Sequence, residues 1–121
     1  QPAILVDGDA SVMMHLAEFD TMVRYEMPLL IVVMNNQMLG AEYYKLDAHK
    51  MNAALSCIAT PDMGAVATGF GGRGRLVRGI PELRTAVAEW VAKPGPMMID
   101  VRIATNVITL PYRRIHYGLD E

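Results

Sequence analysis

The chain alternates short, wholly apolar runs with stretches in which apolar residues recur every three or four positions. Residues 3–6 and residues 29–34 are apolar runs that end in turn-forming residues, a pattern typical of buried strands. Between these runs, apolar side chains recur at helical spacing over residues 12–23, with Ser11 as the expected N-cap. This helix is expected to end near Glu26, because a proline follows shortly afterwards.

Residues 41–46 favour one or two helical turns. After them, the second half of the chain again alternates helices and strands. Its elements are a helix from Thr60 and Pro61 to about Phe70, a strand at residues 75–78, a helix from Pro81 that buries Leu83, Val87, Trp90 and Val91, a strand at residues 97–103, and an extended tail at residues 104–121. Strands that alternate with helices predict a three-layer α/β/α sandwich with a mostly parallel sheet. We expect one domain over residues 1–121.

Composition narrows the function classes. The 121 residues include 52% hydrophobic side chains, enough for a packed core. The formal charge of −2 argues against nucleic acid as a partner, since phosphate binding needs clustered basic residues. The longest apolar run falls far short of the roughly 20 residues that span a bilayer, so no membrane partner is expected. A single cysteine, Cys57, excludes an internal disulfide and favours a reducing, cytoplasmic location.

Two polar residues stand where neighbouring parallel strands would end. Asp9 follows the first apolar run and Asn36 follows the second. The carboxyl ends of parallel strands lie at one edge of a sheet, where ligands bind in open α/β folds. Carboxylate and amide oxygens suit Mg²⁺ or Ca²⁺. The alternative reading is structural, because Asp and Asn end many strands by forming turns.

The segment after the first strand offers a place for phosphate. The first helix follows Gly8 and Asp9 directly, so its free backbone N–H groups and its positive dipole end face the same crevice. The small residues Ala10 and Ser11 allow a diphosphate to approach the backbone closely. Together with the oxygen ligands, this pattern indicates a diphosphate bridged by a metal ion.

A family resemblance extends this interpretation. Gly8-Asp9-Ala10, followed by 24 residues and then Asn35-Asn36, resembles the Gly-Asp-Gly…Asn-Asn motif of thiamine diphosphate enzymes. The later helices and strands resemble the rest of that family's diphosphate-binding domain. The similarity covers nearly the whole chain before the tail and is greatest to acetolactate synthase-like and 2-oxo-acid decarboxylase-like proteins.

The resemblance implies a thiamine diphosphate and Mg²⁺ site. The implied metal ligands are Asp9, the side chain of Asn36 and the backbone carbonyl of Met38. The implied diphosphate contacts are Gly8, Ala10 and Ser11. Residues just after this loop are candidates for the substrate side of the site, and they are Ala41, Tyr43, Tyr44 and Lys45. The implied reaction is decarboxylation of a small 2-oxo acid, with carboligation as its extension.

The resemblance also implies parts that this chain lacks. The glutamate that activates the cofactor belongs to a pyrimidine-binding domain, on the same or another subunit, and the family's earlier strands are absent. We therefore expect a domain truncated on its N-terminal side, inactive by itself and part of a homo-oligomer. Two alternatives remain: a degenerate or non-catalytic assembly module, and a receiver-like domain in which Asp7 and Asp9 bind Mg²⁺.

Overall fold

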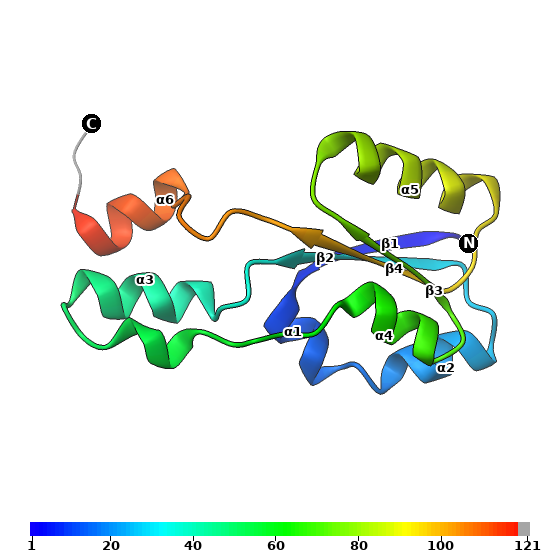
Figure 1. The fold of residues 1–121 in the computed structure, drawn as a ribbon, viewed down its shortest axis with the longest axis horizontal. Coiled ribbons are helices and arrows are strands. Elements are labelled where there is room, and N and C mark those ends of the chain that lie inside the picture. The colour runs from blue at the N-terminus through cyan, green and yellow to red at the C-terminus, as the bar shows by residue number, and fades with distance from the viewer. Residues whose placement is uncertain (119–121) are drawn as a thin grey trace.

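A sheet of four parallel strands forms the centre of the molecule. A computed structural model gives the structure and describes residues 1–118 of the 121. The strand order is β1-β2-β4-β3 (Figure 1). The strands are β1 (Ala3–Gly8), β2 (Leu29–Asn35), β3 (Arg73–Val77) and β4 (Met97–Arg102). The parallel sheet and the helices between its strands confirm the predicted α/β class.

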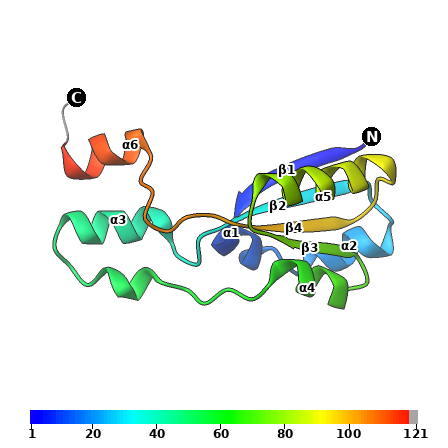
Figure 2. The same cartoon turned by 45° about the horizontal axis from the view of Figure 1, so that its top comes forward.

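Helices cover both faces of the sheet and complete the three layers (Figures 1 and 2). The helices on one face are α1 (Asp9–Met14), α2 (Glu18–Arg24) and α4 (Met63–Gly69), and the helix on the other is α5 (Ile80–Ala92). In β2, Ile31 and Val33 belong to the core under the first group, whereas Leu30 and Val32 belong to the core under α5. Burial on both faces explains why this strand is wholly apolar.

The single helix predicted after the first strand is two helices, α1 and α2, joined by a tight turn at residues 15–17. α1 begins at Asp9 with Gly8 as N-cap, so the prediction of Ser11 as the cap is wrong. The Ser11 hydroxyl donates to Asp7 Oδ2 at 2.6 Å instead. Both helices bury their apolar positions in the same core. Apolar spacing therefore identified the buried face, but it does not report whether a helix axis is continuous.

The helix predicted to begin at Thr60 and Pro61 starts later, at Met63. Asp62 is its N-cap, and the Asp62 carboxylate accepts a hydrogen bond from the Ala65 amide at 3.0 Å. The prediction of Thr60 as the cap is wrong, because its hydroxyl is bonded to residues at the ends of the first two strands.

β3 and α5 differ from their predictions in detail. β3 begins at Arg73 rather than at residue 75, and α5 begins at Ile80. Trp90 is buried as predicted, but Val91 is 63% exposed, so its assignment to the buried face is wrong. One position along a helix turns a side chain by about 100°, which carries Val91 away from the sheet.

A smaller helical lobe lies beyond the carboxyl ends of the strands (Figure 1). Its elements are α3 (Gly40–Ala48), the 3₁₀ turn η1 (Ala53–Ser56), α6 (Leu110–Tyr112) and the π-helical turn η2 (Arg113–Tyr117). The predicted extended tail thus contains two helical turns, and residues 119–121 lie outside the described part. The tail folds back over α3, where the single proton of the Tyr44 hydroxyl is shared between the carbonyls of Thr105, at 3.1 Å, and Val107, at 3.4 Å.

None of the helices in residues 1–118 is long and apolar enough to span a membrane.

Candidate functional site

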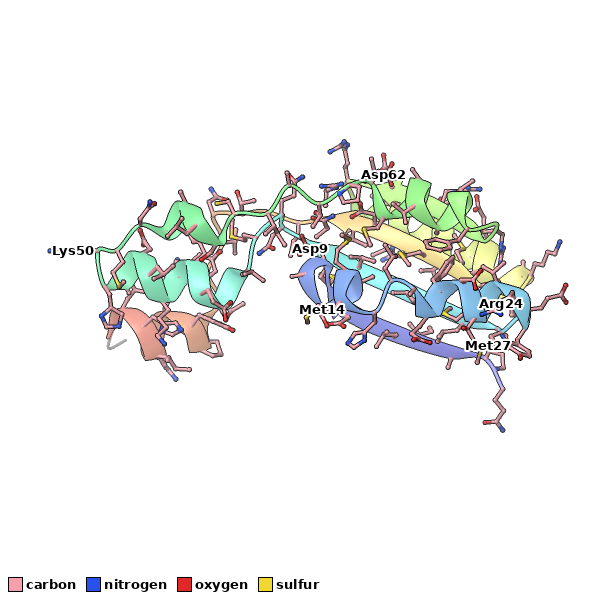
Figure 3. The ribbon with its side chains drawn as sticks, turned by 90° about the horizontal axis from the view of Figure 1, so that it is seen from below. Asp9, Met14, Arg24, Met27, Lys50 and Asp62 are labelled. Carbon is pink, nitrogen blue, oxygen red and sulfur yellow. The ribbon has the colours of Figure 1, made fainter. Side chains whose placement is uncertain are left out.

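The two strand ends that carry Asp9 and Asn36 are neighbours. β1 and β2 pair in parallel, and Gly8 lies opposite Met34 in their register. Asp9 follows β1 directly as the first residue of α1, and Asn36 follows β2. Figure 3 shows Asp9 where the sheet meets the helical lobe. The structure therefore confirms the expectation that both residues lie at one edge of the sheet.

Asp9 is a buried acid with few partners. Its side chain is 1% exposed, and Oδ2 accepts a hydrogen bond from the Thr60 hydroxyl at 3.1 Å. Within residues 1–118 no basic side chain forms an ion pair with it. Burial of a carboxylate without a compensating charge is unfavourable. A bound cation is the kind of group that compensates such a charge.

The loop after β2 is shaped by two consecutive Asx turns. Asn35 Oδ1 accepts from the Gln37 amide at 3.1 Å, and Asn36 Oδ1 accepts from the Met38 amide at 3.3 Å. Gln37 belongs to both turns and adopts the left-handed conformation, with a φ of 58°. Few non-glycine residues adopt this conformation, and Asx hydrogen bonds favour such turns. The loop thereby turns sharply at the point where ligands are expected.

The backbone on either side of Met38 is held by hydrogen bonds that do not involve the Met38 carbonyl. Met38 forms an isolated antiparallel bridge with Cys57, and the amides of Leu39 and Ile58 donate on either side of it, to Ser56 and Gln37. No backbone amide of residues 1–118 donates to the Met38 carbonyl itself.

The Asp9 carboxylate, the Asn36 side-chain amide and this backbone carbonyl are three hard oxygen donors of different kinds. The described residues hold no group of three or more His, Cys, Asp or Glu side chains arranged for a metal. A site with one carboxylate suits Mg²⁺, which takes its remaining ligands from phosphate and water.

The start of α1 offers space and donors for an anion. Gly8 faces open space, because a Cβ built there meets no atom within 4 Å. The first amides of α1 have no partner within the helix, as at every helix start. The hydroxyl of Ser11 is already bonded to Asp7, so Ser11 would meet a diphosphate through its backbone rather than its side chain.

An unpartnered donor lies beside these groups. Asn35 is 1% exposed, and its amide nitrogen Nδ2 is buried without a hydrogen-bond partner in the described structure. Its amide oxygen lies 3.1 Å from the Thr60 hydroxyl, which also contacts Asp9. An unmade hydrogen bond of this kind costs about 1–3 kcal/mol. A phosphate oxygen or a water would satisfy it, so the residues present fit a hydrated, metal-bound diphosphate.

The four substrate-side candidates separate into two pairs. Tyr43 and Tyr44 line a cavity of about 420 Å³ that Asn36 and Met38 also line. Ala41 and Lys45 are exposed and are not among its lining residues.

The far wall of this cavity comes from the C-terminal segment, through Thr105, Asn106, Ile108 and Tyr117. Burial, and then the neighbouring Tyr43, raise the pKa of Tyr44, so its hydroxyl stays protonated. A cavity of about 430 Å³ at the opposite end of the sheet, bounded by Val23, Gly72 and Pro96, shares no residue with the site.

Sequence reasoning missed Thr60 as a site residue. Thr60 precedes Pro61 and Asp62, a combination that predicts a helix start, and this local explanation concealed its other role. It also missed the residues of the C-terminal segment that line the cavity. Contacts between segments that are far apart in sequence bring these residues to the strand ends.

Comparisons with known proteins show the family of the chain. The model of the family described as "Thiamine pyrophosphate enzyme, C-terminal TPP binding domain" matches residues 1–101. The chain is 36% identical over 118 residues to "Probable acetolactate synthase 2, chloroplastic" of Oryza sativa subsp. japonica, covering 88% of this chain and 18% of the relative. It is 33% identical over 110 residues to the acetolactate synthase large subunit of Cyanidium caldarium, covering 85% and 18%.

A solved structure supports the fold. The Rhodococcus jostii RHA1 thiamine diphosphate-dependent 4-hydroxybenzoylformate decarboxylase superposes with a TM-score of 0.76 at 24% identity, over 84% of this chain and 20% of that one. The chain thus spans only about a fifth of the length of the proteins that it matches.

Proposed function

Since the chain belongs to the thiamine pyrophosphate enzymes, as their C-terminal TPP-binding domain, we propose that it holds the cofactor diphosphate through Mg²⁺. Asp9, the side-chain oxygen of Asn36 and the carbonyl of Met38 supply the protein ligands. The observation that carries the proposal is the buried Asp9 carboxylate, which lacks a basic partner within residues 1–118 and lies at the strand end beside Asn36.

The backbone at the start of α1 binds the diphosphate in this proposal. Gly8, Ala10 and Ser11 present small side chains or none, so phosphate oxygens approach the free amides closely. Mg²⁺ offsets the negative charge of the diphosphate, and Asp9 and Asn36 orient the ion. The buried amide of Asn35 donates to a phosphate oxygen or to a water of the metal.

The whole protein, in this proposal, acts on a 2-oxo acid. Bound thiamine diphosphate supplies a carbon nucleophile and an electron sink for decarboxylation. The domain described here binds and orients the cofactor, and the cavity beside Tyr43 and Tyr44 receives part of the substrate. The enzyme is a lyase, or a transferase where carboligation to a second carbonyl compound follows, as the names of the acetolactate synthase relatives suggest.

The activating glutamate is proposed to come from a pyrimidine-binding domain, on the same or another subunit of a homo-oligomer. Two observations support this arrangement: the matched proteins are about five times longer than the chain, and β1 carries exposed apolar side chains, with Ile4 57% and Val6 62% exposed. Residues 1–121 alone are accordingly proposed to be inactive. Turnover of a 2-oxo acid by this purified segment would contradict that.

Calorimetry on the complete protein tests the metal site. We expect wild type to bind thiamine diphosphate only when Mg²⁺ is present. Asp9→Ala should weaken binding by more than about 100-fold, since even outer partners of a metal site contribute about 10–100-fold. Asp20→Ala removes an exposed acid that pairs with Arg24 and serves as the control. Unchanged affinity of Asp9→Ala, with Mg²⁺ still required, would refute the assignment.

A further inference from the structure

We propose that Thr60 is a positioning residue for the metal site, a role that rests on the function proposed above. Its hydroxyl donates to the Asp9 carboxylate and lies against the Asn35 amide oxygen, so that it fixes the Asp9 ligand relative to the end of β2. Thr60 is 8% exposed, and its Oγ1 lies 3.1 Å from both Asp9 Oδ2 and Asn35 Oδ1.

The chemistry of the hydroxyl suits this task. A threonine hydroxyl has one proton to donate, and an ionised carboxylate is the stronger of the two acceptors. Asn35 Oδ1 already accepts from the Gln37 amide, which identifies it as the oxygen rather than the nitrogen. The bond from Thr60 to Asp9 Oδ2 restricts rotation of the carboxylate, and Oδ1 remains as the oxygen available to a cation.

Thr60 also supports the loop that carries the other two ligands. Its backbone carbonyl accepts a hydrogen bond from Gln37 Nε2 at 3.4 Å. Gln37 is the residue in the left-handed conformation that belongs to both Asx turns, and Met38 follows it. One residue therefore contacts the end of β1, the end of β2 and the loop after β2.

The segment that carries Thr60 is itself held against β4. Arg102 donates to the Pro61 carbonyl at 3.1 Å, and the Met63 amide donates to Asp100 Oδ2 at 3.0 Å. Asp100 is completely buried. A metal site keeps its geometry when the residues that support its ligands are themselves held in place.

Two substitutions in the complete protein separate the hydroxyl from the side-chain shape. Thr60→Val preserves the shape and removes the hydroxyl, whereas Thr60→Ser retains the hydroxyl. Thr85→Val serves as the control, because it removes an exposed threonine hydroxyl that bonds only within α5, to the Pro81 carbonyl. The readout is the dissociation constant for Mg²⁺ at a saturating concentration of thiamine diphosphate.

We expect Thr60→Val to raise the dissociation constant for Mg²⁺ about 10–100-fold. The dissociation constant of the Thr60→Ser variant for Mg²⁺ should remain within about threefold of the wild-type value, well below that range. At saturating Mg²⁺ and cofactor, the KM for the 2-oxo acid should not change, which a general loss of structure would not reproduce. If Thr60→Val does not fold, Thr60→Ala is compared with Thr60→Ser by the same titration.

The outcomes distinguish the two proposals. Wild type that binds thiamine diphosphate with Mg²⁺, together with a Thr60→Val variant of equal Mg²⁺ affinity, overturns the role of Thr60 alone. Equal weakening by Thr60→Ser and Thr60→Val also overturns it. Wild type that binds no cofactor in the presence of Mg²⁺ overturns the proposed function, and the role of Thr60 with it.

Discussion

Asp100 and Arg102 form an ion pair at the end of β4, with Arg102 Nη2 3.0 Å from Asp100 Oδ2. The Asp100 side chain is completely buried and that of Arg102 is 18% exposed. The same carboxylate oxygen accepts from the Met63 amide at the start of α4. Asp100 Oδ1 and Arg102 Nε have no hydrogen-bond partner in the described structure. The pair therefore connects β4 to α4 without satisfying all of its own polar atoms.

The first prediction concerns this pair. Asp100→Ala should destabilise the fold by about 3–5 kcal/mol, because it leaves the partly buried Arg102 charge without a carboxylate partner and with only the neutral Pro61 carbonyl as acceptor among the described residues. Thermal unfolding of the complete protein measures the effect. Asp62→Ala, which removes only the exposed cap of α4, should cost about 1 kcal/mol. Equal losses of stability in the two variants would show that the buried ion pair contributes no more to stability than an exposed helix cap.

The second prediction concerns two glycines where α4 crosses β3. A Cβ built on Gly74 lies 1.8 Å from the Gly64 carbonyl oxygen, a backbone atom that cannot move without shifting the helix. Gly74→Ala should therefore cost about 3 kcal/mol or more. Gly69→Ala is the control, since a Cβ there meets nothing within 4 Å and alanine favours helix by up to about 1 kcal/mol. Urea unfolding compares the variants, and a stable Gly74→Ala would contradict the close approach.

The third prediction concerns pH and the C-terminal segment. The Tyr117 hydroxyl donates to Asp47 Oδ2 at 2.7 Å, and this hydrogen bond is the main cause that raises the pKa of Tyr117 from 10.0 to about 12. Because the pKa is raised in the folded state, the contribution of the bond is complete below pH 10 and is lost as the pH rises to about 12. Above that pH, a tyrosinate would face a carboxylate.

Ultraviolet titration of tyrosinate in wild type and in Tyr117→Phe, taken as a difference, gives the pKa of Tyr117. Asp47→Asn should lower that pKa toward 10.0, since it removes the charged acceptor. A Tyr117 pKa that is the same in the Asp47→Asn variant as in wild type would argue against the contact.

The fourth prediction concerns the outer edge of β1. Ile4 and Val6 are exposed on a strand that pairs only with β2 within residues 1–118. Such an edge, with apolar side chains, favours association with another chain. Residues 1–121 in isolation should therefore self-associate in light scattering. Val6→Lys should reduce the association, and Val91→Lys, at an exposed position on α5, should not. A monodisperse monomer at high concentration would refute this prediction.

Local patterns in the sequence predicted most elements of the fold. The wholly apolar residues 29–34 indicated a strand buried on both faces, and β2 is that strand. Helical spacing identified the buried Trp90, although it included Val91 wrongly. These predictions succeed because burial on one or two faces leaves a periodic trace in the sequence itself.

The strand ends were also predictable, because parallel strands that are neighbours bring their carboxyl ends to one edge. That rule placed Asp9 beside Asn36, residues far apart in the chain. The role of Thr60 was not predictable in this way. Its neighbours Pro61 and Asp62 gave a sufficient local explanation, and nothing in the pattern distinguishes a cap from a contact across the sheet.

The tertiary structure decided the contacts that join distant segments. Thr60 contacts Asp9 and Asn35, and Tyr44 contacts the carbonyls of Thr105 and Val107 in the C-terminal segment. The residues in each of these contacts are far apart in sequence. The sequence determined the element order and the motif, since these depend on burial and spacing along the chain. A hydrogen bond between distant side chains depends on positions in space, which exist only after the sheet and its helices have packed together.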